Sequence, residues 1–311
     1  MSKILCIIDG MNDSAFCAEK YPALASFPEQ RFIKTVPDGF EAETLPCVLS
    51  LLGINPPPRY IRGWIEALGA GIDVNPDDLI FRGSWVSLDG NGVCTGFCDA
   101  PYNIPELKQA RYLSLNGYKN LLIFPGYASY AGFIKSVLPF ELLGKCVADS
   151  VYIDIPLLKS TLEQINNIDP ARAMIPWAAS AVQVMPDLSQ SAAVCGANVV
   201  KGIAKALNMK LIATDEMTGD TDTDLKAKLR TVLELAEEYP FVLLHIGGCD
   251  EAAHRMDREE KETFLSRIDE TVISTLLLSD HTIEVASDHG SDSATGKHIG
   301  GKQPFFVQQK A

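Results

Sequence analysis

The second half of the chain alternates short apolar segments with amphipathic segments of helical period, and this rhythm restricts the fold more than any other feature. We predict strands at 191–196, 209–214, 240–246 and 281–287, separated by helices at 197–208, 222–239 and 257–277. Each apolar run has the length of one strand that is buried on both faces. Repeated strand–helix–strand units fold into a parallel sheet with right-handed crossovers. The pattern therefore predicts an α/β fold with a mostly parallel sheet flanked by helices.

Segments near both ends of the chain extend the same sheet. Residues 3–8 (KILCII) are wholly apolar and end at Asp9-Gly10, and residues 304–309 (PFFVQQ) form a last predicted strand. Residues 44–53 (TLPCVLSLLG) indicate a turn followed by an apolar helix. We therefore predict that residues 1–75 and 188–311 form one core domain. The carboxyl ends of its strands are where α/β sheets place their ligands.

Residues 76–187 lack this rhythm and contain many turns. Residues 78–97 alternate apolar with polar side chains around the turn sequence D-G-N-G, which predicts a hairpin. Further strands are predicted at 119–124 and 147–155. We expect a smaller inserted α+β domain here, which would cap a substrate bound to the core domain.

Composition narrows the classes of function. The chain has 27 Lys and Arg against 40 Asp and Glu, a net charge of −13. Sequence-independent binding of nucleic acid or of an anionic membrane needs a basic surface, so we expect neither. No segment approaches the roughly 18 apolar residues of a membrane span, and the first residues lack the features of a signal peptide. The eight cysteines are scattered without a C-x-x-C pair, which indicates reduced thiols. We therefore expect a cytoplasmic protein.

The histidines are unevenly distributed, because all five lie from residue 245 onward. His245 is inside an apolar strand, and we predict a packed, hydrogen-bonded core residue. His281 begins a strand after Ser279-Asp280, and we predict an exposed side chain. The other three histidines lie in loops next to predicted strands.

Acidic and histidine side chains gather at the predicted strand-to-loop junctions, namely Asp9, Asp250, His254, Asp288, His289 and His298. In a parallel sheet such junctions share one edge, so we expect these side chains to converge. Carboxylate with imidazole suits Zn²⁺, Mn²⁺ or Fe. Asp250 and His254 have i, i+4 spacing and can face one ion from one helical turn. Asp288 and His289 are adjacent and can serve separate sides of a two-metal centre, an arrangement used for phosphoryl transfer.

The order of these residues, with a threonine or serine after the first aspartate, resembles the alkaline phosphatase superfamily. Within it, the chain is similar to the archaeal-type 2,3-bisphosphoglycerate-independent phosphoglycerate mutases and their homoserine-kinase-like relatives. The motifs that carry the resemblance run from residue 4 to about 307. IIDGMND resembles D-G-x-G-D, LSLLGINP resembles L-S-L-L-G-Y-D-P, VVKGIAKALNM resembles L-V-K-G-I-A, MTGDTDTD resembles A-T-G-x-x-D-T-D, and CDEAAH resembles A-P-D-E-A-G-H.

The resemblance implies an alkaline-phosphatase-like core that holds two divalent ions, Mn²⁺ or Zn²⁺. Asp250, His254 and His298 would hold one ion. Asp9, Asp288, His289 and the oxygen of the nucleophile, Thr44, would hold the other. A plainer role for Thr44 is a helix N-cap, and the two roles are compatible.

The implied reaction has two steps. Thr44 would attack the phosphate in line and form a phosphothreonine. In a mutase the glycerate then takes the phosphate back on its other hydroxyl, whereas in a phosphatase water takes it. The resemblance thus implies a glycolytic isomerase that interconverts 3-phosphoglycerate and 2-phosphoglycerate, with a small phosphorylated metabolite as its partner and a homo-oligomer as a possible assembly.

Substrate recognition leaves alternatives open. Arg62, Arg82 and Lys201 match family positions expected to bind substrate, but residues 76–187 contain only two further arginines, Arg111 and Arg172. Thr44-Leu45-Pro46 resembles the T-x-P of related phosphodiesterases and phosphatases more than the serine of the mutases. A metal-dependent phosphatase or phosphodiesterase of the same fold therefore stays an alternative, as does a non-catalytic relative.

Overall fold

The computed structural model describes residues 1–55, 61–134, 137–147 and 156–310, and the chain divides into two compact units. The first unit is Met1–Pro56 with Met185–Ala311, and the second is Pro57–Val184. The first boundary precedes the expected one at 75/76 because α3 (Arg62–Gly69) packs on strands of the second unit. There the Gly63 amide donates a hydrogen bond of 2.9 Å to Ser180 Oγ.

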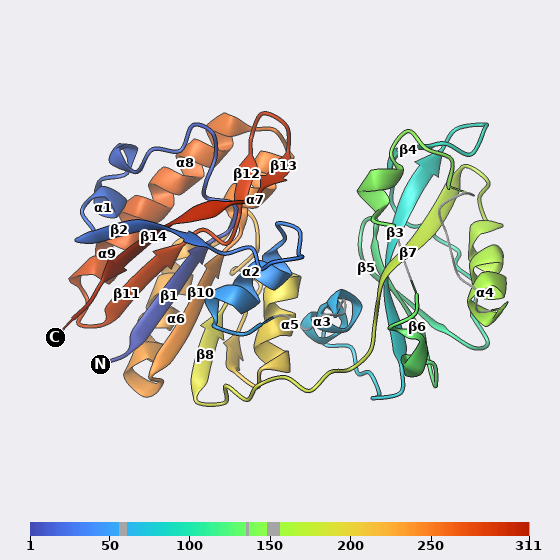
Figure 1. Ribbon diagram of the computed structural model, residues 1–311, viewed down its shortest axis with the longest axis horizontal. Helices are drawn as coiled ribbons and strands as arrows, with labels where there is room; N and C mark the ends of the chain where they lie inside the picture. The colour runs from blue at the N-terminus through green and yellow to red at the C-terminus, as the bar shows by residue number, and fades with distance from the viewer. Residues whose placement is uncertain (56–60, 135–136, 148–155, 311) are drawn as a thin grey trace. The chain divides into compact units, whose positions relative to one another are not determined.

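A seven-stranded sheet forms the centre of the first unit (Figure 1). Its order is β2 (Glu29–Lys34), β14 (Lys302–Gln308), β11 (Thr282–Ala286), β1 (Lys3–Ile8), β10 (Phe241–Ile246), β8 (Ser191–Val194) and β9 (Lys210–Ile212). The five strands from β11 to β9 are parallel, while β14 runs antiparallel to both of its neighbours, β11 and β2. The predicted mostly parallel α/β sheet is therefore confirmed. The edge strand β2 was not predicted, because its sequence EQRFIK is largely exposed and carries little apolar signal.

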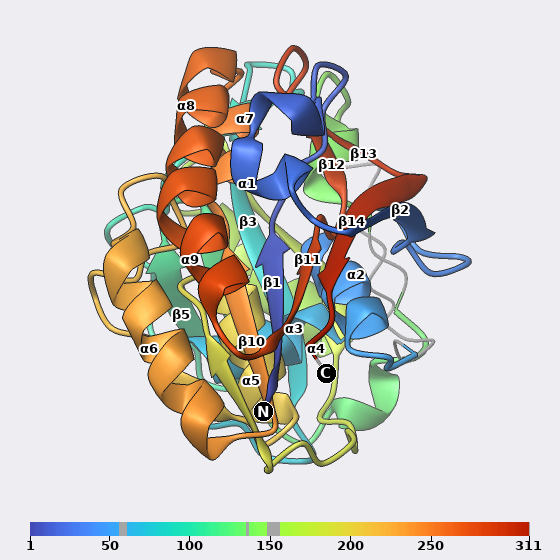
Figure 2. The same ribbon diagram turned by 90° about the vertical axis from the view of Figure 1, so that its left-hand side faces the viewer.

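Helices cover both faces of this sheet (Figures 1 and 2). One face carries α6 (Leu225–Glu238), α8 (Arg258–Ile268) and α9 (Ser274–Leu278); the other carries α2 (Thr44–Leu51) and α5 (Asn198–Ala206), which pack on each other. Along β1, Ile4, Cys6 and Ile8 belong to the core under α6 and α8. Side chains alternate along a strand, so Ile7 and then Asp9 face the opposite side.

The predicted helix at 257–277 is interrupted. A π-helical turn at Asp269–Ile273 separates α8 from α9. The buried Asp269 carboxylate accepts hydrogen bonds from the amides of Ala23 (3.0 Å) and Leu24 (2.8 Å) at the start of α1 (Pro22–Ala25). Asp269 thus supplies acceptors for a distant helix end, a contact that the helical period of the sequence does not contain.

The second unit contains a five-stranded antiparallel sheet. Its strands are β3 (Leu79–Leu88), β4 (Cys94–Phe97), β5 (Arg111–Asn116), β6 (Lys119–Phe124) and β7 (Arg172–Ser180), and α4 (Pro156–Asn166) packs on β7. The predicted hairpin is β3 with β4, and the predicted strand at 119–124 is β6. The strand predicted at 147–155 falls almost wholly outside the described residues. Antiparallel strands with helices confirm the α+β prediction for this part of the chain.

Short 3-10 turns and small elements complete the described chain, namely η1 (Ala18–Lys20), η2 (Ala128–Tyr130), η3 (Pro139–Leu142), α7 (Gly248–His254), β12 (Gly290–Asp292) and β13 (Lys297–Ile299). All eight cysteines are free thiols. Among the residues that the structure describes, no helix is both long and apolar enough to cross a membrane.

The loop after β9 packs closely on the carboxyl end of β8. A Cβ atom on Gly196 would lie 2.1 Å from the Met217 carbonyl oxygen and 2.2 Å from the Thr218 carbonyl carbon. Both are backbone atoms, so no side-chain rotation can relieve the clash.

We expect Gly196→Ala to lower the free energy of unfolding by about 3 kcal/mol or more, because the backbone must move to admit the methyl group. Urea unfolding of the metal-free protein measures this. Gly300→Ala is the control in the same unit, since a Cβ at that position meets nothing nearer than 4.0 Å. Equal midpoints for the two variants would contradict the close packing described here.

Candidate metal centre

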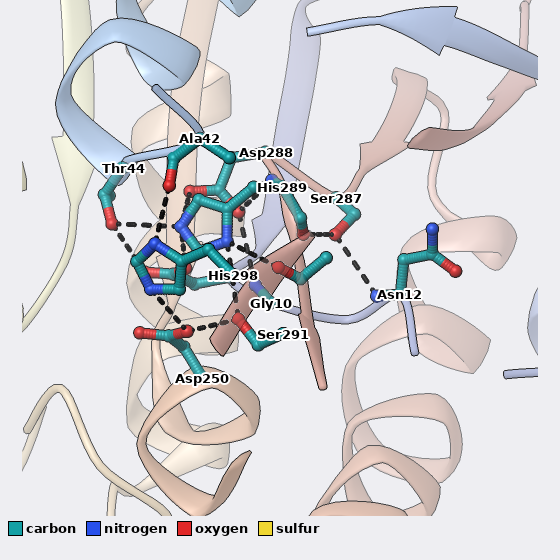
Figure 3. A network of polar contacts seen from close by, with 12 residues as sticks. Gly10, Asn12, Ala42, Thr44, Asp250, Ser287, Asp288, His289, Ser291 and His298 are labelled. Carbon is teal, nitrogen blue, oxygen red and sulfur yellow. Dashed lines mark hydrogen bonds and ion pairs between the residues drawn. The ribbon is translucent and has the colours of Figure 1, made fainter. Parts of the chain in front are cut away.

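Thr44, Asp250, Asp288, His289 and His298 lie together at the carboxyl edge of the first unit's sheet (Figure 3), and Asp9 and His254 contact them there. Asp9 follows β1, Asp288 and His289 follow β11, and α7 after β10 carries Asp250 and His254. Thr44 is the first residue of α2, and His298 lies on β13, which pairs with β12 as a short hairpin. The strands β11, β1 and β10 are neighbours in the sheet, so three separate chain segments bring Asp9, Asp288 with His289, and Asp250 with His254 to one place, while α2 and β13 add Thr44 and His298.

The first group consists of Asp250, His254 and His298. His254 Nε2 lies 3.2 Å from Asp250 Oδ2 and 3.1 Å from His298 Nε2. His298 Nε2 lies 3.4 Å from Asp250 Oδ1. The helical i, i+4 spacing of Asp250 and His254 thus directs both side chains to one point, as expected.

The second group consists of Asp9, Thr44, Asp288 and His289. His289 Nε2 lies 3.4 Å from Asp9 Oδ1, 3.5 Å from Asp288 Oδ2 and 3.4 Å from Thr44 Oγ1. Thr44 Oγ1 lies 3.5 Å from Asp9 Oδ2. The two groups adjoin, because the rings of His289 and His298 stack with centroids 4.1 Å apart.

These distances suit metal coordination. Ligands bound at about 2.0–2.2 Å around a tetrahedral ion stand roughly 3.3–3.6 Å apart. The spacings in both groups fall close to that range. Ligand atoms of Asp250, His289 and His298 also lie within 4.8 Å of one another, as do those of Asp9, His245 and Asp288.

The three histidines of the two groups are fixed in one tautomer. Nδ1 of His254 lies 2.8 Å from the Gly296 carbonyl oxygen, Nδ1 of His298 lies 2.6 Å from that of Ala42, and Nδ1 of His289 lies 3.2 Å from that of Gly290. A carbonyl oxygen only accepts, so each Nδ1 carries the proton. In the neutral imidazole that a metal needs, each Nε2 lone pair is then directed inward, the arrangement typical of metal-binding histidines.

Three carboxyl groups are buried together here, although burial disfavours the charged form of each. Asp9, Asp250 and Asp288 are only 4%, 8% and 0% exposed. Burial, with the neighbouring charges of Asp288 and Asp250, raises the pKa of Asp9 well above its ordinary value. Burial also opposes the charge on Asp250, but contacts with His254 and His298 outweigh it and hold its pKa well below the usual range. The contact with Asp250 raises the pKa of His254 to about 8.

Several buried polar atoms in this cluster lack hydrogen-bond partners among the described residues, including Asp9 Oδ1 and Asp288 Oδ2. Buried oxygens without a donor are costly unless a cation is nearby. Unpartnered carboxylate oxygens, inward-facing imidazoles and tetrahedral spacing together fit divalent cations of the Zn²⁺ or Mn²⁺ type.

Three expectations need correction. His245 is fully buried as predicted, but its ring nitrogens form no hydrogen bond with described residues, and its Nε2 lies 3.3 Å from Asp9 Oδ2. His281 is buried, not exposed, because the Ser2 amide lies 3.4 Å from its Nδ1. The N-cap of α2 is Glu43, so Thr44 is the first helical residue. Each difference depends on a neighbour that is distant in sequence or on the exact start of a helix.

Sequence reasoning missed Ser291, whose hydroxyl donates to Asp250 Oδ1 and lies 3.4 Å from His289 Nδ1. Sequence reasoning also missed why position 10 has to be a glycine. That residue has a φ of +65°, and a Cβ there would lie 2.7 Å from Ser291 Oγ and 2.9 Å from Asp250 Cα. The proximity of Ser291 to the Asp288-His289 pair was the only available signal, and a serine near ligands is too common to single out.

The predicted substrate-binding residues do not all lie in one unit. Lys201 is partly buried on α5 of the first unit, while Arg62 and Arg82 belong to the second. The two arginines converge on one carboxylate, with Arg62 Nε 3.1 Å and Arg82 Nε 3.5 Å from Glu66 Oε1. Arg82 is only 3% exposed, so it is a buried arginine beside Glu66 and not a solvent-exposed one.

Two family models match the chain. The model of the metalloenzyme superfamily matches residues 109–311, which is more than half of the chain. The model of 2,3-bisphosphoglycerate-independent phosphoglycerate mutase matches residues 32–100. Both agree with the resemblance seen in the sequence, which is thereby confirmed.

Named relatives and solved structures agree with these models. The 2,3-bisphosphoglycerate-independent phosphoglycerate mutase 1 of Methanocaldococcus jannaschii is 28% identical over 301 residues, covering 78% of this chain and 72% of that protein. The mutase of Methanobrevibacter smithii is 27% identical, covering 83% and 74%. The fold is shared with the PH0037 protein from Pyrococcus horikoshii (TM-score 0.77, 19% identity, 98% and 87% covered). It is also shared with the cofactor-independent phosphoglycerate mutase from Thermoplasma acidophilum (TM-score 0.57, 18% identity, 99% and 90% covered).

Removing the Asp288 carboxylate should make the metal-free protein more stable to unfolding, but should reduce the stability that the protein gains from bound metal. In Asp288→Asn the remaining side-chain oxygen can still accept from the amides of Gly10 and His289, which lie 3.2 and 2.8 Å from Asp288 Oδ1. Repulsion with Asp9 is relieved, so we expect the metal-free variant to be about 1 kcal/mol more stable than wild type. Excess Mn²⁺ should stabilise wild type by roughly 3 kcal/mol at a hundred times its Kd, and the variant much less.

Urea unfolding with and without Mn²⁺ measures both effects. Asp292→Asn is the matched control, because that carboxylate accepts from Ala294 and Thr295 outside the two groups. A metal-free Asp288→Asn protein that is less stable than wild type would show that repulsion does not dominate the cluster.

Metal affinity should rise with pH. A metal needs neutral imidazole, and the Asp250 carboxylate raises the pKa of His254 to about 8 in the metal-free protein. Below that pH the ion must displace a proton, so we expect affinity for the first group to increase roughly tenfold per pH unit and level off above about pH 8. Calorimetric Mn²⁺ titrations in buffers of different ionisation enthalpy count the released protons. Against the effect of burial, the contact with Asp250 also raises the pKa of His298, so His254→Gln removes one of two titrating imidazoles of the first group. An unchanged number of released protons in that variant would refute the assignment to His254.

Proposed function

The chain belongs to the metalloenzyme superfamily, and from that membership we propose that it is a phosphoglycerate-mutase-like phosphotransferase. Its substrates would be 3-phosphoglycerate and 2-phosphoglycerate, interconverted through a phosphothreonine on Thr44. The names of the relatives support this substrate class, since the two archaeal relatives described above are 2,3-bisphosphoglycerate-independent phosphoglycerate mutases. A cytoplasmic location, a role in glycolysis and a homo-oligomer stay predictions.

The position of the Thr44 hydroxyl is the observation that supports this proposal most. Its oxygen contacts both Asp9 Oδ2 and His289 Nε2, at 3.5 and 3.4 Å. Thr44 is also the first residue of α2, an eight-residue helix. The positive end of the helix dipole favours a phosphate attached at that point. A threonine that only filled space in the core would not need its hydroxyl beside a carboxylate and an imidazole.

The residues that would hold two ions are the two groups described above. Asp250, His254 and His298 would hold one, and Asp9, Asp288, His289 and Thr44 the other. Two divalent cations, Mn²⁺ or Zn²⁺, would supply positive charge to the transferring phosphate and to the nucleophile. The donor set of carboxylates and imidazoles matches such ions better than it matches Mg²⁺ or Ca²⁺.

The chain's own residues then have separate tasks. Thr44 attacks the phosphate in line, and the bond from phosphorus to the glycerate oxygen breaks as the bond to Thr44 forms. The proton that the Thr44 hydroxyl gives up ends on the leaving glycerate oxygen, so the phosphate is carried on the protein and the glycerate keeps a free hydroxyl. Asp9 and His289 hold the Thr44 oxygen in the attacking position. The glycerate turns, and its other hydroxyl takes the phosphate back from Thr44. Chemistry of this kind depends mainly on positioning and charge, which a rigid sheet edge can supply.

A mutase must also retain the glycerate and exclude water. We propose that Arg62, Arg82 and Lys201 bind substrate, because they match the family positions expected to do so. Guanidinium groups suit this task because they pair with carboxylates through two parallel hydrogen bonds. Both arginines already share the Glu66 carboxylate, so a substrate would compete with Glu66 for them.

A second candidate function is a phosphatase or phosphodiesterase with the same phosphothreonine. The sequence Thr44-Leu45-Pro46 favours it, because the mutases commonly have serine at this position followed by an acidic residue. Water instead of glycerate would then remove the phosphate from Thr44. A non-catalytic relative fits less well, since every expected ligand position is filled.

We expect wild type with Mn²⁺ to convert 3-phosphoglycerate to 2-phosphoglycerate, and Thr44→Ala to lose at least about 10³-fold in rate because the nucleophile is gone. Thr44→Ser keeps the hydroxyl and should retain activity. Both products, 2-phosphoglycerate and inorganic phosphate, are measured on the same sample.

Thr35→Ala is the matched control, because Thr35 is a buried threonine of the same unit that lies outside the two ligand groups. Release of phosphate without 2-phosphoglycerate would select the phosphatase over the mutase. Full activity of Thr44→Ala in either assay would eliminate Thr44 as the nucleophile.

A further inference from the structure

We propose that the Ser291 hydroxyl is a positioning group that links the two ligand groups and orients Asp250 for metal binding. Figure 3 shows Ser291 between Asp250 and the Asp288-His289 pair. Its hydroxyl contacts Asp250 of the first group and His289 of the second. The inference rests on the proposed two-metal centre and adds a residue that binds no ion itself.

The direction of each hydrogen bond follows from counting protons. The Ser291 hydroxyl donates its single proton to Asp250 Oδ1, since a carboxylate oxygen accepts. His289 Nδ1 carries a proton that it shares with the Gly290 carbonyl oxygen. At 3.4 Å from His289 Nδ1, Ser291 Oγ can therefore only accept from it. The result is a one-way chain from His289 through Ser291 to Asp250.

Ser291 is itself held firmly. Its amide donates to the Asn12 carbonyl oxygen at 2.9 Å, and its own carbonyl oxygen accepts from Lys261 Nζ at 2.5 Å. Lys261 is 3% exposed, and its ammonium lies 3.2 Å from Asp13 Oδ2. Gly10 leaves the space that the hydroxyl occupies, since a Cβ there would lie 2.7 Å from Ser291 Oγ. The hydroxyl is fully buried and has no freedom to choose other partners.

This geometry determines the orientation of the Asp250 carboxylate. With Oδ1 held by Ser291, Asp250 Oδ2 faces His254 Nε2 at 3.2 Å. A carboxylate that is fixed in this way loses less rotational freedom when it binds an ion. Hydrogen bonds in a chain also polarise one another, so a cation at His289 Nε2 strengthens the bond that Ser291 makes to Asp250. Loss of the hydroxyl should therefore weaken the first group specifically.

The test is an equilibrium titration of the metal-free protein with Mn²⁺, with free Mn²⁺ followed by electron paramagnetic resonance. We expect wild type to bind two ions. In Ser291→Ala, one binding step should weaken 10- to 100-fold, the usual effect of losing a partner of a metal ligand. The other step should stay within about threefold. Adding Asp288→Asn, which removes a ligand of the second group, should abolish the step that remains.

Ser287→Ala is the matched control. Ser287 is an equally buried serine beside the same ligands, but its hydroxyl contacts only backbone, donating to the His289 carbonyl oxygen and accepting from the Asn12 amide. A purely structural role for Ser291 predicts equal effects of Ser291→Ala and Ser287→Ala on Mn²⁺ binding, and that result would overturn the inference. Wild type that binds no Mn²⁺ would instead contradict the proposed centre, and the inference with it.

A second pair of variants covers the case in which Ser291→Ala does not fold. Thr and Val have the same shape and differ in the hydroxyl, so Ser291→Thr should keep both binding steps and Ser291→Val should lose one. Equal Mn²⁺ binding by these two variants would also reject a role for the hydroxyl.

Discussion

The burial of three carboxylates at one edge of the sheet is the constraint on which the candidate metal centre depends. Asp9, Asp250 and Asp288 are almost inaccessible to water, and their charges act on one another across a few ångströms. In a low-dielectric interior such charges are unfavourable unless cations or donors compensate them. The surrounding histidines, the Ser291 hydroxyl and backbone amides supply part of the compensation. Divalent cations would supply the remainder, and this is why the sheet edge fits metals better than it fits any arrangement of protein groups alone.

The fold supports this concentration of charge through rigid elements. Asp9 and Asp288 directly follow parallel strands, and α7, which carries Asp250 and His254, begins just after β10. Backbone carbonyls set the tautomer of each ligand histidine, so little rearrangement is required when an ion binds. The same rigidity suits phosphoryl transfer, in which positioning and charge supply most of the rate enhancement. Catalysis and stability therefore make opposite demands on these carboxylates. The metal-free protein would be more stable with fewer of them, whereas the proposed reaction needs all of them.

Prediction from sequence succeeded where the signal was local. The apolar run at 3–8 is β1, and the i, i+4 pair of Asp250 and His254 lies on a helix as expected. It failed where distant contacts decide the outcome. The polar strand β2 forms by pairing with β14, and the π turn at 269–273 accompanies the capping of α1 by Asp269. His281 is buried against the N-terminal residues, a contact that its own neighbours in the sequence do not reveal.

The sequence by itself determined which acidic and histidine side chains follow the strands and helices of the core, because each one adjoins a strand or helix whose apolar pattern is readable along the chain. The order of strands was decided only by the tertiary structure, since β11, β1 and β10 are far apart in sequence and become neighbours through hydrogen bonds between their backbones. The same holds for the protonation of the histidines and for Ser291, because a tautomer or a hydroxyl's donor direction depends on which acceptor lies within about 3 Å. Apolar periodicity is a property of single segments, whereas the geometry of a metal site is a property of several segments brought together.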